Sequence, residues 1–238
     1  MQKQNSLENI DSDKLPEHVA IIMDGNRRWA KKNGLPIIMG HRRGVQSVKN
    51  IVSAANKMGI KVLTIYAFST ENWNRSKLEV NALMFLLKKV LKKYTVELKE
   101  NGIRLMVSGR IEDMPSGVSK EILSSMEKLK DGKNLILNIA LNYGGRQEII
   151  DAVNKIIKSK TKKINISSFN KFLYTYPLPD PDLLIRTSGE LRISNFLLWQ
   201  TAYCEFYVTD VLWPDFGEKE FAQAIAEYKK RERRFGKK

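Results

Sequence analysis

Short apolar runs alternate with helical patterns along most of the chain, beginning near residue 19. Six runs are rich in apolar and β-branched residues, as strands buried on both faces are. These runs are residues 19–23, 62–68, 103–109, 135–143, 182–189 and 205–213. Apolar residues recur at helical spacing over 44–58, 79–100, 118–129, 148–157 and 221–233. This order predicts an α/β fold with a mainly parallel central sheet flanked by helices.

The pattern also predicts the domain organisation. Residues 1–15 are polar and lack the alternation, so we expect a flexible N-terminal arm. From residue 16 to 238 we find neither an internal repeat nor a low-complexity linker, which favours one folded domain.

The predicted helix 79–100 is apolar on nearly two faces, because Phe85 and Leu86 lie off its main stripe. Burial on both sides within a core explains this pattern. A hydrophobic tunnel beside the helix is the alternative explanation, so both interpretations stay open.

The charge of the chain indicates anionic partners. Its 238 residues include 41 Lys+Arg and 26 Asp+Glu, which gives a net charge of +15 and a pI near 9.8. Nucleic acid, an anionic membrane or phosphorylated small molecules would each suit this charge. The longest apolar run, 82–87, is far shorter than the ~20 residues of a membrane span. The first fourteen residues lack a signal sequence and Cys204 is the single cysteine, so we expect a cytoplasmic protein.

Polar residues follow the carboxyl ends of four predicted strands. These loops are 24–26, 69–72, 142–145 and 186–189. Each loop has a simple local explanation; Asp24, for example, could cap the next helix. Because open α/β sheets bind ligands along this edge, four such loops together predict a ligand site.

The chemistry of these loops indicates a diphosphate. They hold Asp24, several amides and hydroxyls, and nearby arginines: Arg27, Arg28, Arg42, Arg43, Arg75, Arg186 and Arg192. The guanidinium fork pairs with phosphate oxygens, and one carboxylate among arginines suits a Mg²⁺–diphosphate site. Glu205 is a candidate second metal ligand, although a surface strand residue would look the same.

Other signatures are missing. The chain has neither a G-x-x-x-x-G-K-[ST] loop nor a G-x-G-x-x-G motif, and its two histidines lack metal-binding spacing. His18 precedes the first strand and is interpreted as structural. His41 stands beside two arginines, where a role as diphosphate donor and a role in packing are both open.

Five segments resemble, in order, the motifs of the cis-prenyltransferases, the undecaprenyl diphosphate synthase family. They are HVAIIMDGNRRWAKKNG…GHRRG (18–44), YAFSTENWNR (66–75), LNIALNYGGRQEI (137–149), DLLIRTSGELRISNFLLWQ (182–200) and YCEFYVTDVLWPDF (203–216). The resemblance runs from about residue 16 to 236. It implies a Mg²⁺-dependent enzyme that adds isopentenyl diphosphate repeatedly to an allylic diphosphate, commonly farnesyl diphosphate, with cis double bonds. It also implies a homodimer with a hydrophobic tunnel.

In bacteria the product of such an enzyme is the precursor of the lipid carrier for cell-wall glycans. Carried over by motif position, Asp24 and Asn72 would be catalytic, and Asp24 and Glu205 would hold the metal. Substrate-binding residues would be Gly25, Asn26, Arg27, Arg28, Trp29, His41, Ser69, Thr70, Glu71, Trp73, Arg75, Arg186, Arg192 and Ser194. A greasy product and a basic surface further predict transient contact with a membrane, where the protein would be peripheral.

Two positions depart from the family pattern. Many members carry an arginine where this chain has Ile37, and bacterial members often have glycine where it has Arg27. We hypothesise that Arg27 or Arg42 supplies the missing charge to the allylic diphosphate.

Two rival functions remain less consistent with the residues. A basic nucleic-acid module would interleave basic and exposed aromatic residues, and Asp24 would repel a phosphate backbone, so we expect no nucleic-acid partner. A non-catalytic scaffold subunit of the same family would not need Asp24, Asn72 and Arg75. Product length would depend on the tunnel near 82–91 and 135–141, and dimer contacts are expected at 206–213 and the last helix.

Overall fold

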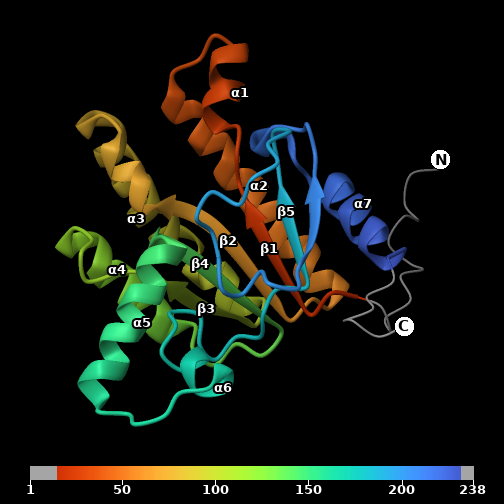
Figure 1. The fold of residues 1–238 in the computed structure, drawn as a ribbon. Coiled ribbons are helices and arrows are strands. Elements are labelled where there is room, and N and C mark those ends of the chain that lie inside the picture. The colour runs from red at the N-terminus through yellow and green to blue at the C-terminus, as the bar shows by residue number, and fades with distance from the viewer. Residues whose placement is uncertain (1–14, 232–238) are drawn as a thin grey trace.

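The centre of the molecule is a sheet of six strands, all parallel to their neighbours (Figure 1). The computed structural model describes residues 15–231. The strands are β1 (His18–Ile22), β2 (Val62–Ser69), β3 (Ile103–Ser108), β4 (Leu135–Tyr143), β5 (Leu183–Arg186) and β6 (Glu205–Val208). The predicted α/β fold is confirmed.

The strand order, β3-β4-β2-β1-β5-β6, places β1 between β2 and β5. The chain therefore moves to one side of β1 first and returns to its other side later. Ligands of open α/β sheets bind at such a reversal, outside the carboxyl ends of the strands. Residues that follow β1, β2 and β5 are thus brought to one place by topology.

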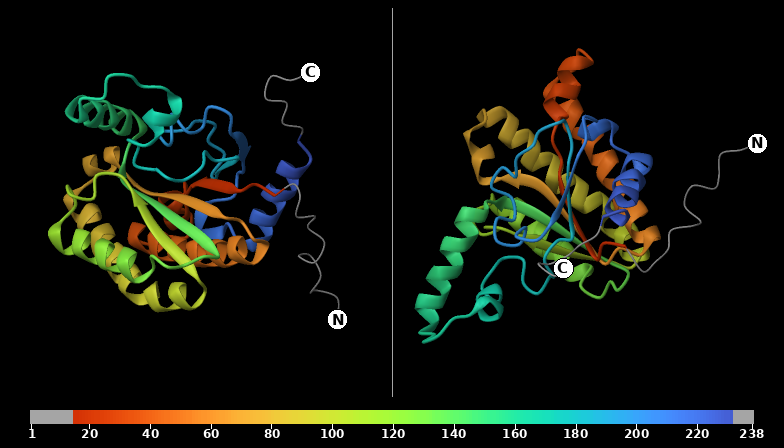
Figure 2. Two further views of the ribbon diagram at one scale, coloured as in Figure 1. Left: turned by 90° about the horizontal axis from the view of Figure 1, so that it is seen from below. Right: turned by 45° about the vertical axis from the view of Figure 1, so that its right-hand side comes forward.

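Helices cover both faces of the sheet (Figure 2). They are α1 (Asn26–Lys32), α2 (Ile37–Met58), α3 (Lys77–Glu100), α4 (Ser116–Lys128), α5 (Gly145–Ser159), α6 (Ile166–Asn170) and α7 (Glu218–Lys229). Apolar side chains of α2, α3, α4 and α7 pack with the main core on one face of the sheet. The opposite face carries a smaller cluster around Phe196 and Leu197, and α5 and α6 pack together in a third cluster. Within 15–231, no helix meets the length and apolarity of a membrane span.

Helix α2 begins seven residues before the predicted start at residue 44, so His41, Arg42 and Arg43 are helical. Two glycines conceal this extension in the sequence. A Cβ at Gly40 would lie 2.1 Å from the Asn26 carbonyl oxygen, and one at Gly44 would lie 2.3 Å from Asn26 Oδ1. These glycines therefore let α2 approach the start of α1, and they do not mark a turn.

Several element boundaries differ from the prediction. Strands β5 and β6 end at Arg186 and Val208, earlier than expected. After β5 the chain turns at Ser188 and Gly189, which have positive φ. The predicted loop after β2 contains a 3₁₀ helix, Thr70–Asn74, and the short α6 was not predicted. Of the predicted N-terminal arm, residues 1–14 lie outside the described part, as do residues 232–238.

Candidate functional site

A polar cavity of about 480 Å³ opens at the carboxyl ends of β1, β2 and β5. It is lined by Ile22, Met23, Asp24, Tyr66, Ser69, Glu71, Asn72, Arg75, Arg186, Ser194 and Asn195. Three of the four predicted polar loops contribute to this cavity or border it. The strand order explains the meeting, because β1 lies between β2 and β5.

Asp24 is fixed by its backbone and presents its side chain to the cavity. Its carbonyl oxygen accepts hydrogen bonds from Thr187 Oγ1 at 2.7 Å and from the Trp213 N–H at 3.0 Å. The next residue, Gly25, has φ +109°, and a Cβ there would lie 2.5 Å from Ser188 Oγ. Asp24 does not cap α1, whose N-cap is Gly25 with no side-chain hydrogen bond. The carboxylate is therefore available to the cavity.

The counter-ion of Asp24 is the buried guanidinium of Arg186. Arg186 Nη2 donates to Asp24 Oδ2 at 2.9 Å, and Nη1 donates to Ser194 Oγ at 2.7 Å and to the Arg192 carbonyl oxygen. Only 5% of the Arg186 side chain is exposed, and its Nε lacks a hydrogen-bond partner among residues 15–231. A buried charge with an unsatisfied donor is costly unless a ligand completes it.

Two further arginines surround a second carboxylate beside the cavity. Arg28 Nη1 lies 3.2 Å from Glu190 Oε1 and donates to the Ser188 carbonyl oxygen at 3.0 Å. Its Nη2 is 3.4 Å from Asp24 Oδ2. Arg192 pairs with Glu190 at 2.5 Å, and 58% of its side chain is exposed. Arg28 and Arg192 therefore border the cavity without lining it, and Glu190 was not predicted from the sequence.

The 3₁₀ helix after β2 holds the predicted residues of the second loop. Asn72 Oδ1 accepts a hydrogen bond from the Ser69 N–H at 3.2 Å, which closes a capping box. Glu71 accepts hydrogen bonds from Thr70 Oγ1 at 3.1 Å and Asn195 Nδ2 at 2.8 Å. Burial alone would raise the pKa of Glu71, but these and neighbouring hydrogen bonds outweigh it and lower the pKa. Glu71 is thus ionised at the cavity wall.

Asn195 joins three loops and was missed by the sequence analysis. Besides its bond to Glu71, its carbonyl oxygen accepts from the Gly145 N–H at 2.7 Å, and Oδ1 accepts from the Arg146 N–H at 2.9 Å. The first amides of α5 are therefore occupied by Asn195. This explains why the predicted loop 142–145 does not line the cavity. Asn195 has a φ of +61°. Asn tolerates this conformation better than most residues, and that tolerance is the one local feature by which the sequence could have indicated it.

Glu79, also not predicted, lies near three cationic or basic groups at the start of α3. Arg75 Nη1 lies 3.1 Å from Oε1, His41 Nε2 lies 3.8 Å from Oε1, and Arg27 Nη1 lies 3.8 Å from Oε2. The spacing of Arg75 and Glu79, four residues apart on a helix start, could have revealed this pair.

His41 is buried and neutral at pH 7. Burial, helped by the charge of Arg75, lowers its pKa to about 4, despite the opposing effect of Glu79. Its contact with Glu79 is therefore not an ion pair at neutral pH. The buried Nε2 has no hydrogen-bond partner in the described part of the chain. Together with the unpartnered Asn26 Oδ1, it leaves two polar atoms ready for a ligand.

Trp29 and Trp73 lie outside the cavity lining, and each donates a hydrogen bond that holds a neighbouring segment in place. Trp29 Nε1 donates to Asp215 Oδ1 at 2.8 Å, which ties α1 to the 3₁₀ helix Trp213–Asp215. Trp73 Nε1 donates to Asn142 Oδ1 at 2.7 Å, and its ring packs edge-on against Phe68. Each tryptophan thus fixes a loop that carries cavity residues.

Within one chain, Glu205 lies apart from Asp24, so the two expected metal ligands do not meet there. Glu205 is in register with Leu183 on β5, and Leu183 with Val19 on β1, at the amino ends of the strands. Asp24 stands five residues beyond Val19, or roughly 16 Å along the strand direction. Glu205 instead accepts a hydrogen bond from Arg231 Nη1 at 2.7 Å.

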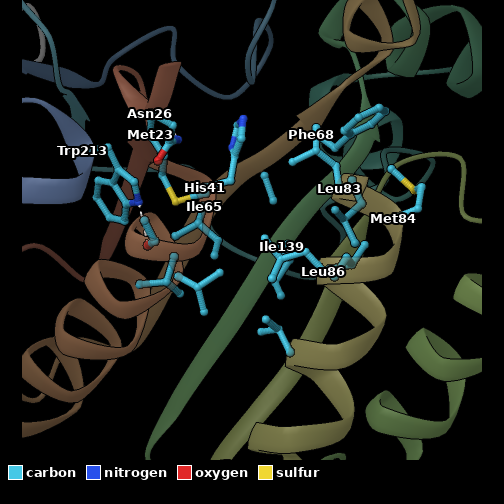
Figure 3. A pocket seen from close by; sticks show the side chains of 17 residues that line it. Met23, Asn26, His41, Ile65, Phe68, Leu83, Met84, Leu86, Ile139 and Trp213 are labelled. Atoms are coloured by element: carbon cyan, nitrogen blue, oxygen red, sulfur yellow. Dashed lines mark hydrogen bonds between the residues drawn. The ribbon is translucent and has the colours of Figure 1, made fainter. Parts of the chain in front are cut away.

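An apolar cavity of about 150 Å³ begins beside Asn26 and His41 and extends between α2 and α3 over the sheet (Figure 3). A second cavity of about 160 Å³ continues toward the ends of these helices. The two share the lining residues Val45, Val48, Val90 and Ile139, and we call them together the tunnel.

The tunnel answers the question left open for the apolar helix α3. Leu83, Leu86 and Leu87 line it, whereas Phe85 is 68% exposed and does not. At the far end the lining becomes polar, with Lys49 Nζ 2.9 Å from Glu97 Oε1. A polar cavity thus opens next to an apolar tunnel, which suits an amphiphilic ligand with an anionic head.

The donor set of the polar cavity fits a Mg²⁺ ion held largely by a substrate. Asp24 is its candidate carboxylate ligand, with hydroxyl and amide oxygens of Ser69 and Asn72 in the same cavity. Among the described residues, no cluster of three or more His, Cys, Asp or Glu could enclose a metal. Mg²⁺ commonly binds through one or two carboxylates plus substrate phosphates, so this sparse site is adequate.

Comparisons with known proteins agree on one family. Residues 22–236 match the family model described as "Putative undecaprenyl diphosphate synthase". An isoprenyl transferase of Clostridium perfringens is 52% identical over 94% of this chain and 91% of its own length. An isoprenyl transferase of Bacillus subtilis is 49% identical over 96% and 90%.

Solved structures of similar proteins share the fold. Lavandulyl diphosphate synthase from Lavandula x intermedia, in complex with dimethylallyl diphosphate, superimposes with a TM-score of 0.91 at 38% identity and covers 94% of this chain and all of its own. A probable undecaprenyl diphosphate synthase from Campylobacter jejuni has a TM-score of 0.80 at 34% identity, covering 93% and 99%.

Proposed function

Since the chain belongs to the undecaprenyl diphosphate synthase family and is a prenyltransferase, we propose that it adds isopentenyl diphosphate repeatedly to an allylic diphosphate. Farnesyl diphosphate is the proposed primer, and each new double bond is cis. The product is a long-chain polyprenyl diphosphate, the precursor of the bacterial lipid carrier for cell-wall glycans. The observation that carries the proposal is the polar, arginine-bordered cavity beside an apolar tunnel.

The reaction separates charge, and the residues of the cavity are placed to stabilise it. Cleavage of the allylic C–O bond leaves a diphosphate with extra negative charge and an allylic fragment with cationic character. Asp24 would hold a Mg²⁺ ion, which would supply positive charge to the leaving diphosphate. Preoriented positive charge often contributes more to catalysis than any other single effect. Arg186, with an unsatisfied Nε, and Arg28 add to it from the protein side.

The allylic diphosphate is proposed to bind at the mouth of the tunnel. His41 Nε2, which has no hydrogen-bond partner among the described residues, and Arg27 Nη1 each lie 3.8 Å from a Glu79 carboxylate oxygen there, so both are available to an incoming diphosphate. Arg42 is exposed and contacts Met39 Sδ at 3.8 Å. Of the two arginines hypothesised to compensate for Ile37, we therefore propose Arg27.

Isopentenyl diphosphate is proposed to bind beside Arg186, Arg192 and Ser194. Two adjacent diphosphate sites align the nucleophilic double bond with the allylic carbon, which lowers the entropic part of the barrier. Asn72 is proposed to assist proton removal from the condensed product. Ser69, Thr70, Glu71, Trp73 and Arg75 shape this part of the site, and Gly25, Asn26 and Trp29 shape the allylic side.

The growing chain is proposed to enter the tunnel, where burial of each isoprene unit favours elongation at about 25 cal/mol per Å². We further propose a homodimer that resides in the cytoplasm and touches the membrane transiently. Phe206 in β6 and Tyr203 just before this strand are exposed, which is consistent with dimer contacts near 206–213.

The test is incubation of the purified protein with radiolabelled isopentenyl diphosphate, farnesyl diphosphate and Mg²⁺, followed by chromatography of the extracted lipid. Long labelled polyprenols support the proposal, and their loss on chelation with EDTA supports the metal. A parallel incubation replaces farnesyl diphosphate with dimethylallyl diphosphate. If labelled product forms only there and stops after a single condensation, the proposed chain elongation is contradicted.

A further inference from the structure

The chain has a long segment without acidic residues. From Gly25 to Thr70 there is no Asp or Glu, whereas nine Lys or Arg occur. Six of the nine fall within 27–43, in α1 and the first turns of α2: Arg27, Arg28, Lys31, Lys32, Arg42 and Arg43. The positive charge is therefore concentrated on one part of the fold.

This part projects from the molecule as a corner between α1 and α2 (Figures 1 and 2). Residues 31–37 are all exposed, and Gly34, with φ +64°, makes the turn. Three aliphatic side chains stand on it: Leu35 is 39% exposed, Ile37 37% and Met39 38%. We call residues 31–43 the basic corner. Apolar side chains gathered on one protruding segment are more typical of an interaction surface than singly scattered ones are.

The cations of the basic corner have no carboxylate partner in the described part of the chain. Arg27 and Arg28 pair with carboxylates of the site, but Lys31, Lys32, Arg42 and Arg43 form no ion pair within residues 15–231. Exposed cations interspersed with exposed aliphatic side chains along one segment are complementary to a surface that is anionic outside and hydrocarbon beneath.

We propose that the basic corner is the docking surface for an anionic lipid bilayer. The aliphatic side chains enter the interface, and the four unpaired cations lie at the headgroups. This inference rests on the proposed function, because a polyprenyl product is insoluble in water and has to be transferred to a membrane. His41, which belongs to the corner, lines the tunnel next to Asn26, so the corner also adjoins the mouth of the tunnel.

The chemistry of the corner favours lipid over nucleic acid. Single-stranded nucleic acids bind where basic residues alternate with exposed aromatic rings. Residues 31–43 contain no aromatic residue besides His41, which is mostly buried. Aliphatic side chains supply burial in hydrocarbon but little stacking with bases.

The binding test uses sedimentation of the full chain with vesicles, without substrates. We expect binding to vesicles of 30% phosphatidylglycerol in phosphatidylcholine, weaker binding at higher salt, and little binding to pure phosphatidylcholine. Lys31→Gln/Lys32→Gln and Leu35→Gln/Met39→Gln should each weaken binding about tenfold or more. The matched controls, Lys158→Gln/Lys162→Gln and Val96→Gln/Leu123→Gln, alter exposed residues elsewhere and should bind normally.

A second measurement locates the contact. In a Cys204→Ser background, an environment-sensitive dye on Leu35→Cys should shift to the blue with anionic vesicles, and one on Leu123→Cys should not. Equal losses in corner and control variants, equal binding to neutral vesicles, or displacement of the vesicles by excess single-stranded DNA without a dye shift would each overturn the inference. Prenyl transfer in detergent, measured separately, tests the proposed function and should be unchanged in the corner variants.

Discussion

The amino and carboxyl edges of the sheet differ in whether their buried polar groups have hydrogen-bond partners. At the amino edge, His18 has both ring nitrogens bonded, to the Pro179 carbonyl oxygen and Thr64 Oγ1 at 2.7 Å each. At the carboxyl edge, His41 is also buried, but its Nε2 is unpartnered. Five buried side-chain atoms lack a partner in the described chain, and four belong to the carboxyl edge: Asn26 Oδ1, His41 Nε2, Arg186 Nε and Ser188 Oγ.

The difference separates stability from function. An unsatisfied buried polar group costs about 1–3 kcal/mol, so a fold that tolerates four of them in one place has a use for them there. At the amino edge, satisfied groups stabilise the fold. At the carboxyl edge, the unsatisfied groups destabilise the free protein. The three that can donate, His41 Nε2, Arg186 Nε and Ser188 Oγ, are available to a diphosphate.

The largest effect on the rate is expected when Asp is replaced by Asn at the carboxyl edge, and the same replacement at the amino edge is its control. Asp24→Asn should lower the rate of prenyl transfer between a hundred- and a thousandfold, since it removes the charge proposed to hold Mg²⁺. Asp182→Asn alters a carboxylate that accepts hydrogen bonds from the Glu17 and His18 N–H groups. It should cost about 1–3 kcal/mol in the free energy of unfolding and leave the rate per folded molecule unchanged. Steady-state kinetics measures the rate, and urea unfolding measures the free energy of unfolding. A large loss of rate in Asp182→Asn, with only a loss of stability in Asp24→Asn, would contradict the assignment of function to the carboxyl edge.

The two histidines predict how stability depends on pH. Burial is the main cause that lowers the pKa of each from 6.5 to about 4. Between these values the unfolded chain binds more protons, so the free energy of unfolding falls as the pH drops. Each histidine should contribute about 2 kcal/mol of loss between pH 7 and 5. Urea unfolding across this range should show half of that slope removed in His18→Gln. An unchanged slope would contradict the buried, neutral state of His18.

The arginines at the tunnel mouth offer a finer test of the carboxyl edge. Arg27→Ala should raise the KM for farnesyl diphosphate about tenfold, as expected for loss of one charged hydrogen bond. Arg42→Ala, in the exposed control, should change that KM less than twofold. If neither substitution changes it, the proposed compensation for Ile37 is wrong.

The smallest expected effect concerns the tunnel that leads away from the carboxyl edge. Val48 lines both apolar cavities, so Val48→Phe should narrow their junction and shift the products toward shorter chains. Val96→Phe adds the same ring on an exposed face of α3 and serves as the control. Chromatography of the labelled lipids compares the two, and identical product lengths would exclude the junction as a constraint.

The sequence by itself determined the fold class and most of the elements. Alternation of apolar runs and helical spacing is a local property, and it identified the six strands and the edge where Asp24 and Arg186 meet. Family motifs then located most of the cavity lining. The extension of α2 was hidden because Gly40 and Gly44 serve a close approach to Asn26, which local patterns do not reveal.

Tertiary structure alone decided which candidates share the cavity. Strand register separates Glu205 from Asp24 within one chain, and Asn195 occupies the α5 amides that the 142–145 loop would otherwise have offered. Register and loop closure depend on partners far apart in sequence, so no window along the chain contains them. The same reason kept Asn195 out of the prediction, whereas Glu79, four residues after Arg75, had a local signal in the sequence.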